Sequence, residues 1–204
     1  MRLGLFGGSF DPVHFGHLLL AECCREQCRL DQVWFVPAAR PPHKQGELTP
    51  GGARIEMLQL AIGGHAAFSV CPLEIERAGT SYTVDTLESV RQMQPQAELF
   101  FLMGGDSLAD LPQWKDPRRI CELALPVVVR RPQAAELDFT KLKPIASPDR
   151  IAQMIQHVVE MPQIDLSSRD IRRRVGAGES IRYRTPRAVE KYIEAHRLYG
   201  SRGD

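Results

Sequence analysis

Short apolar runs alternate with longer segments of helical periodicity over most of the chain. The apolar runs do not alternate with polar residues, so each predicts a strand that is buried on both faces of a parallel sheet. Predicted strands cover residues 3–6, 32–36, 68–71, 99–103 and 126–129, and predicted helices cover residues 17–28, 53–62, 83–93 and 117–123. This order predicts an α/β fold with a mostly parallel sheet.

The pattern is less regular toward the end of the chain. A short sixth strand is predicted at residues 158–159, and two helices at residues 168–175 and 186–196. No shift in composition marks a boundary, so we expect one domain over residues 1–204, with a C-terminal helical part at about 163–204. Ligands of open parallel sheets bind beyond the carboxyl ends of the strands, which directs attention to the segments that follow strands.

Composition and charge exclude several classes of protein. The net charge is +1, whereas a general nucleic-acid binder would carry a basic excess. The five cysteines, an odd number at irregular spacing, predict reduced and mostly buried thiols rather than a disulfide framework. The sequence shows no signal peptide, and its apolar stretch at residues 123–129 is too short to span a membrane. We therefore expect a cytoplasmic protein with neither nucleic acid nor membrane as a partner.

The segment from Gly7 to His17 follows the first predicted strand and opens the first helix. Gly7 and Gly8 permit close approach of the backbone, Ser9 adds a hydroxyl donor, and the N–H groups of a helix start favour an anion. His14 and His17 share one face of a helical turn and can donate hydrogen bonds to phosphate oxygens. Taken singly, the glycines are compatible with an ordinary turn and the histidines with an incidental pair. Their joint placement favours a phosphate-binding site.

Other chemistry at this segment fits less well. No Lys-Ser/Thr pair follows the glycines, so this is not the phosphate loop of that type, and the Gly-x-Gly-x-x-Gly dinucleotide pattern is absent. A zinc site would need a third ligand besides His14 and His17, and nothing in the sequence nominates one.

Residues 8–17, Gly-Ser-Phe-Asp-Pro-Val-His-Phe-Gly-His, resemble the signature of the nucleotidylyltransferase superfamily, which shares a His-x-Gly-His motif. The resemblance implies a Rossmann-like, doubly wound domain. It also implies adenylyl or cytidylyl transfer by direct in-line attack, with pyrophosphate leaving. His14 and His17 would then be catalytic, and Phe10 would join the glycines and Ser9 as a substrate-binding residue.

A second segment, residues 165–172, precedes an arginine-rich helical turn. Ser167 or Ser168 can cap that helix, and Arg172 can clamp phosphates bidentately. Taken alone, the segment favours an ordinary N-cap followed by a solvated basic face. The superfamily carries a similar Ser-Ser-Thr-x-x-Arg motif that holds the β- and γ-phosphates of ATP, which implies this role for Ser167, Ser168 and Arg172. Arg169 stands where that motif usually has Thr.

Three middle segments, residues 36–44, 81–87 and 104–114, resemble those of bacterial nicotinate-nucleotide adenylyltransferases. With the two motifs above, the resemblance runs in order along nearly the whole chain. These middle segments are the ones that imply which molecule receives the transferred group, here called the acceptor.

The chemistry of these segments suits an anionic pyridine nucleotide. Lys44 can supply a point charge to a phosphate, Trp114 offers a flat face to a pyridine ring, and Tyr82 and Thr83 offer donors to a carboxylate. Each also has a structural explanation. Lys44 fits a solvated loop, Trp114 fits core packing, and Thr83 fits the start of a helix.

Three further residues follow predicted strands. Gly104 and Asp106 lie after the fourth, where Asp106 can accept hydrogen bonds from ribose hydroxyls. Arg130 follows the fifth and is a candidate for the adenine pocket, although an exposed charge fits it nearly as well.

We therefore expect an enzyme of NAD biosynthesis that joins ATP and nicotinate mononucleotide into nicotinate adenine dinucleotide and pyrophosphate. The acceptor phosphate is already anionic, so no general base is assigned, and Mg²⁺ would be carried by the ATP phosphates. We expect a monomer or a weak homo-oligomer.

Alternatives differ in their acceptor or in their class. Nicotinamide mononucleotide or pantetheine phosphate could replace the nicotinate nucleotide, or the chain could be a non-catalytic nucleotide-sensing module. An RNA-binding protein that uses Arg169 and residues 172–174 fits poorly with the near-neutral net charge.

Overall fold

A computed structural model describes residues 1–42, 46–130 and 136–200. Within these residues six strands form one sheet in the order β3-β2-β1-β4-β5-β6. All neighbouring strands are parallel, and this order is that of a doubly wound Rossmann-like fold, as predicted. The strands are β1 (Arg2–Gly8), β2 (Gln32–Pro37), β3 (Phe68–Val70), β4 (Glu98–Gly104), β5 (Leu125–Arg130) and β6 (Val159–Glu160).

The helices that the periodicity predicts are present, with small shifts at their ends. They are α1 (Phe15–Gln27), α2 (Gly51–Ile62), α4 (Thr83–Met93), α6 (Pro117–Leu123), α8 (Ser168–Gly176) and α9 (Arg187–Ala195). Five short elements were not predicted. They are α3 (Leu73–Arg77), α5 (Gly105–Asp110), α7 (Pro148–Gln156) and the 3₁₀ turns η1 (Leu111–Gln113) and η2 (Phe139–Leu142).

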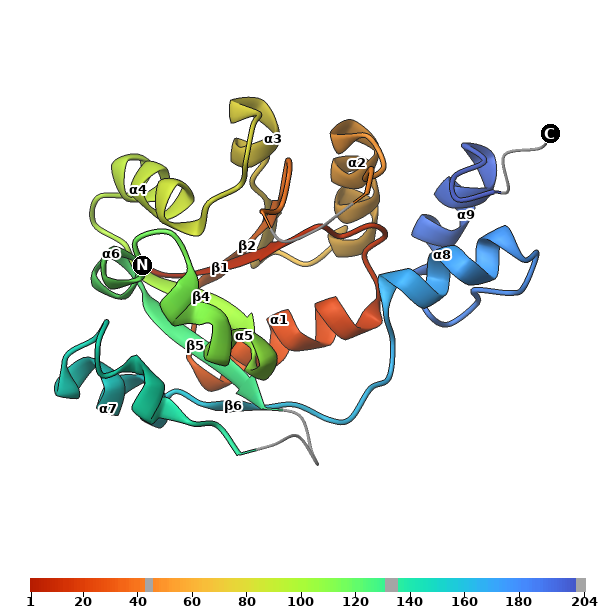
Figure 1. Cartoon of the computed structure of the whole chain (residues 1–204). Coiled ribbons are helices and arrows are strands. Elements are labelled where there is room, and N and C mark those ends of the chain that lie inside the picture. Colours follow the sequence, from red (N-terminus) through yellow and green to blue (C-terminus); the bar gives the residue numbers. More distant parts are fainter. Residues whose placement is uncertain (43–45, 131–135, 201–204) are drawn as a thin grey trace.

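The helices cover both faces of the sheet. Figure 1 shows α2, α3 and α4 over one face and α1 against the other, while α8 and α9 lie beyond the carboxyl end of β1. None of the helices in the described parts of the chain has the length and apolar character needed to cross a membrane.

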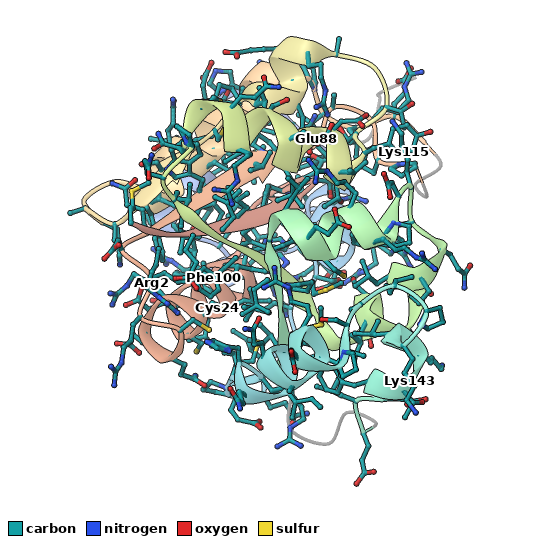
Figure 2. All side chains as sticks on the ribbon, turned by 90° about the vertical axis from the view of Figure 1, so that its left-hand side faces the viewer. Arg2, Cys24, Glu88, Phe100, Lys115 and Lys143 are labelled. Carbon is teal, nitrogen blue, oxygen red and sulfur yellow. The ribbon has the colours of Figure 1, made fainter. Side chains whose placement is uncertain are left out.

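The core is densest around the central strands. Residues 99–103 of β4 are all buried, which explains why this strand is apolar without alternation. Phe100 is fully buried, and the guanidinium of Arg2 lies 4.5 Å from the centre of its ring. Both side chains are labelled in Figure 2. Arg2 thereby closes the edge of the core with its charge still near water.

The five cysteines are buried free thiols. Burial raises the pKa of the Cys28 and Cys121 thiols to about 11. Both therefore stay protonated at neutral pH and behave as small apolar side chains.

Replacing Phe100 by alanine tests the packing of the core. We expect Phe100→Ala to lower the free energy of unfolding by about 3–5 kcal/mol, because the ring leaves a cavity that the central strands cannot close. Urea unfolding followed by circular dichroism measures this loss. The control is Met93→Ala, at a position that is 52% exposed, where we expect a change of less than about 0.5 kcal/mol. Equal losses in the two variants would contradict the burial of Phe100.

Candidate active site

The histidine motif and the serine–arginine motif line the same cavity. It has a volume of about 760 Å³ and lies between the loop that follows β1 and the start of α8. His14 and His17 line it from one side, and Ser167, Ser168 and Arg172 line it from the other. The sequence predicts this convergence, and we refer to the space as the nucleotide cavity.

The two histidines are held by the start of α1. His14 is the N-cap residue and is buried, and His17 stands three positions further on. The backbone N–H of His14 donates to Nδ1 of His17 over 3.2 Å, and the two rings stack with their centres 3.7 Å apart. A neutral imidazole that accepts at Nδ1 carries its proton on Nε2, so His17 offers an N–H donor. A side chain at Gly16 would crowd His14, with its Cβ only 3.0 Å from the ring.

Helix α8 is bonded directly to the loop after β1. The hydroxyl of Ser168 donates to the carbonyl of Pro12 over 2.8 Å, and Arg172 donates to the carbonyl of Asp11 over 2.5 Å. The hydroxyl of Ser167 accepts from the N–H of Asp170 at 3.1 Å and so caps α8. Arg169, at the usual Thr position, also lines the nucleotide cavity.

A second cavity of about 550 Å³ adjoins the first, and Ser9 lines both. Gly7 and Gly8 form part of its wall. Of the residues that the sequence predicts for the acceptor, Tyr82 and Thr83, at the start of α4, and Trp114 line this space, and we refer to it as the acceptor cavity.

The acceptor cavity presents an aromatic surface and a helix start. Trp114 is partly buried and packs edge-on against Phe101, with ring centres 5.9 Å apart and an angle of 73°. Tyr82 is the N-cap residue of α4, and its side chain makes no capping hydrogen bond. The first N–H groups of α4 are therefore available as donors to an anion.

Two charged residues of the acceptor cavity were missed by the sequence reasoning. Among the described lining residues, Lys115 is the one cation and Glu74 the one carboxylate. The Lys115 ammonium, labelled in Figure 2, lies 2.9 and 3.0 Å from the two oxygens of Asp85 and 4.6 Å from the ring centre of Tyr82. Glu74 is buried and accepts from the Thr86 hydroxyl over 2.6 Å. Lys115 directly follows the segment that resembles the family, whereas Glu74 lies in the unpredicted α3.

Apart from Phe10, four predicted site residues are not placed in either cavity. Gly104 ends β4, and Asp106 is exposed in the first turn of α5. Arg130 is exposed at the carboxyl end of β5, and its Nε donates to Glu160 over 2.8 Å. Lys44 lies outside the described residues.

Phe10 differs from its expected place as a ligand contact. Its side chain is fully buried and packs edge-on against His17, with ring centres 5.0 Å apart. A Cβ at Gly8 would lie 2.9 Å from the Phe10 ring, so the second glycine leaves room for this side chain. Phe10 thus packs against His17 within the core, and it lines neither cavity.

Arg54 is a buried residue of the site that no local pattern indicates. Its guanidinium donates to the carbonyls of Ser9 over 2.9 Å, Ala38 over 2.8 Å and Thr49 over 2.8 Å. Burial lowers the pKa of Arg54 below its ordinary value. The side chain joins the loops that follow β1 and β2 to the segment that precedes α2.

The sequence model of the cytidylyltransferase-like family matches residues 5–174, and the chain belongs to this family. A probable nicotinate-nucleotide adenylyltransferase of Thermomicrobium roseum is 47% identical over 201 residues, covering 97% of this chain and 91% of that protein. A protein of the same description from Thermus thermophilus is 47% identical over 199 residues, covering 98% of this chain and all of that protein. These identities place the chain among the nicotinate-nucleotide adenylyltransferases, as the resemblance predicts.

Solved structures agree on the fold. A Plasmodium falciparum nicotinic acid mononucleotide adenylyltransferase complexed with NaAD has a TM-score of 0.74 at 17% identity, and 97% of each chain is covered. The same protein complexed with APC has a TM-score of 0.72 at 16% identity, with 97% of this chain and 96% of that chain covered.

Removing the Arg54 guanidinium tests its structural role. We expect Arg54→Met to lower the free energy of unfolding by about 2–4 kcal/mol, because buried carbonyl groups lose their donor while the aliphatic packing is retained. Urea unfolding measures the change. Arg118→Met is the matched control, because the exposed Arg118 donates only to the carbonyl of Pro144 among the described residues. A loss no larger than that of the control would refute the role of Arg54.

Proposed function

We propose that the chain transfers the adenylyl group of ATP to nicotinate mononucleotide, releasing pyrophosphate and forming nicotinate adenine dinucleotide. The observation that carries this proposal is the meeting of two cavities at Ser9. One is lined by histidines, serines and arginines that suit a triphosphate, and the other by an aromatic ring and a helix start that suit an anionic ring.

The chain's part in the reaction is positioning and charge stabilisation. The 5′-phosphate of the acceptor is already a nucleophile at neutral pH, so no residue need remove a proton from it. His14 and His17 bind the phosphates around the α-phosphorus, where Nε2–H of His17 donates to the oxygens as charge develops. The leaving pyrophosphate is held by the hydroxyl of Ser167, by further N–H groups of Arg172 and by the backbone N–H groups at the start of α8, that of Ser168 among them.

A divalent cation fits this site only as a companion of the nucleotide. The described residues contain no group of three His, Cys, Asp or Glu side chains that could hold a metal ion. Glu47 is the one carboxylate among the described residues that line the nucleotide cavity. We therefore propose that Mg²⁺ arrives on the ATP phosphates, where it neutralises part of their charge.

Each group of the acceptor has a suitable partner in the acceptor cavity. The phosphate lies toward Ser9, and the pyridine ring stacks on Trp114. The carboxylate accepts from the start of α4 at Tyr82 and Thr83 and pairs with Lys115.

The remaining predicted contacts stay proposals. Gly104 and Asp106 are proposed to contact the ribose of ATP from the carboxyl end of β4. Arg130 is proposed for the adenine pocket and Lys44 for a phosphate. A monomer or a weak homo-oligomer stays a prediction. A cytoplasmic location stays a prediction.

One observation favours a second acceptor. Glu74 is a buried carboxylate in the acceptor cavity. A carboxylate accepts hydrogen bonds from the amide of nicotinamide, whereas it repels the carboxylate of nicotinate. This feature suits nicotinamide mononucleotide.

Pyrophosphate release with ATP and a panel of acceptors tests the proposal. We expect turnover with nicotinate mononucleotide to exceed turnover with nicotinamide mononucleotide and with pantetheine phosphate. A preference for either of the latter would reassign the acceptor. ATP binding without turnover on any acceptor would replace the enzyme by a nucleotide-sensing module.

Removing the second histidine tests the charge-stabilising role. We expect His17→Ala to lower kcat by about 10²–10³-fold, the scale for losing one donor to transition-state charge. Steady-state kinetics on folded protein measures this. His157→Ala is the control, since His157 follows α7 and bonds to the carbonyl of Gln153. Near-normal turnover of His17→Ala would remove His17 from the chemistry.

Neutralising Lys115 tests the recognition of the carboxylate. We expect Lys115→Met to raise KM for nicotinate mononucleotide about fivefold, the scale of one partly exposed charge pair at ~1 kcal/mol, and to leave KM for nicotinamide mononucleotide within about twofold. Lys115→Arg keeps the charge and should retain the preference, and Lys143→Met is a control at an exposed lysine. Equal changes in KM for both acceptors in Lys115→Met would show that Lys115 does not recognise the carboxylate.

A further inference from the structure

Residues 184–199 contact the segment at residues 9–17, which we call the histidine loop, at three points. The Tyr199 hydroxyl donates to Oδ1 of Asp11 over 2.6 Å, and the Thr185 hydroxyl donates to the carbonyl of Val13 over 2.8 Å. The backbone N–H of Phe15 donates to the carbonyl of Arg184 over 3.2 Å. The family's sequence model ends at residue 174, so all three partners lie beyond the part of the chain that it matches.

These contacts fall on alternate residues of the loop and lie on both sides of His14. Positions 11 and 13 precede it and position 15 follows it. The side chains of Asp11 and Thr185 are almost completely buried, at 2% and 1% exposure. A hydrogen bond between buried groups has no water to replace a lost partner, so breaking it costs more than breaking an exposed one.

Asp11 extends these contacts to two other elements. Its Oδ2 accepts from the backbone N–H of Thr49, just before α2, at 3.2 Å. Its carbonyl accepts from Arg172 of α8. Burial and the neighbouring Asp11 carboxylate raise the pKa of Tyr199, so its hydroxyl remains a donor over the whole working range of pH.

We propose that residues 184–199 form a C-terminal brace that positions His14 and His17 for the triphosphate, with Thr185 and Tyr199 as positioning residues. The proposal rests on the proposed function, because it takes the nucleotide cavity to be the place of reaction. The brace fixes the backbone on each side of His14, and the N–H of His14 in turn orients the ring of His17. A displacement of about 1 Å in such a site can slow a reaction by about 10²-fold, so a loosened brace should appear as a loss of rate.

The brace is tested with variants that remove one hydroxyl each. We expect Tyr199→Phe and Thr185→Val each to lower kcat about tenfold and to leave KM for the pyridine nucleotide within about twofold, since the acceptor cavity is not lined by either residue. Thr185→Ser keeps the hydroxyl and should restore kcat. Tyr183→Phe is the matched control, because Tyr183 lies in the same part of the chain and is 84% exposed.

A purely structural role would give a different result. It would lower the melting temperature and the fraction of active protein, but kcat per active site would equal that of the wild type, and this result would overturn the proposal. If Tyr199→Phe fails to fold, the comparison of Thr185→Val with Thr185→Ser decides the question in the same way.

A second readout separates the brace from the proposed function. The ¹⁵N resonances of the His14 and His17 rings and the Kd for ATP, measured by calorimetry, need no acceptor. We expect both to change in Tyr199→Phe and neither to change in Tyr183→Phe. If the wild type releases no pyrophosphate with nicotinate mononucleotide, the proposed function fails while these measurements still judge the brace. Unchanged resonances together with unchanged Kd would refute it.

Discussion

Four carbonyl groups of the loop after β1 accept hydrogen bonds from donors that come from distant parts of the chain. Those of Ser9, Asp11, Pro12 and Val13 accept hydrogen bonds from Arg54, Arg172, Ser168 and Thr185, respectively. A carbonyl that points into a phosphate site would repel its ligand. With these acceptors occupied, the loop can present histidine rings and backbone N–H groups to an anion, and the rest of the site depends on this arrangement.

The positions of the two cavities, and the different residues that line them, follow from where the strands end. β1 lies between β2 and β4 in the sheet, so the loop after it can face segments from both halves of the fold. One side receives α8, with its cationic residues, and the other receives the start of α4 and Trp114. Ser9 lies where the two meet, which is where a phosphate of one substrate must approach the α-phosphate of the other for in-line transfer.

Patterns within one segment made most of the fold predictable from the sequence. The apolar runs predicted all six strands, and α4 and α6 have the predicted bounds. α3 and α5 have five and six residues, which is too short for a helical period to appear. The start of α7 is marked in the sequence, although its period did not predict it, because Ser147 caps the helix and Pro148 occupies its first position. The convergence of His14 and His17 with Ser168 and Arg172 was predictable because each set resembles a family motif.

Contacts between distant residues set the limit of that prediction. Arg54 is read from the sequence as one more helix cation, and nothing near it reveals that it is buried beneath Ser9. Phe10 stands within the motif, yet its ring belongs to the core. Tyr199 has no local pattern that would connect it to Asp11. Such residues become visible only when the chain has been folded.

The bond between Tyr199 and Asp11 joins residues that are 188 positions apart, and this distance has a consequence for biosynthesis. A chain leaves the ribosome from its N-terminus, so Asp11 emerges long before its partner Tyr199. All six strands precede residue 161, so every strand has been translated before the loop meets Thr185 or Tyr199. Translation must therefore pass residue 199 before the loop acquires its final geometry, and termination between the sheet and that residue would yield a product without it.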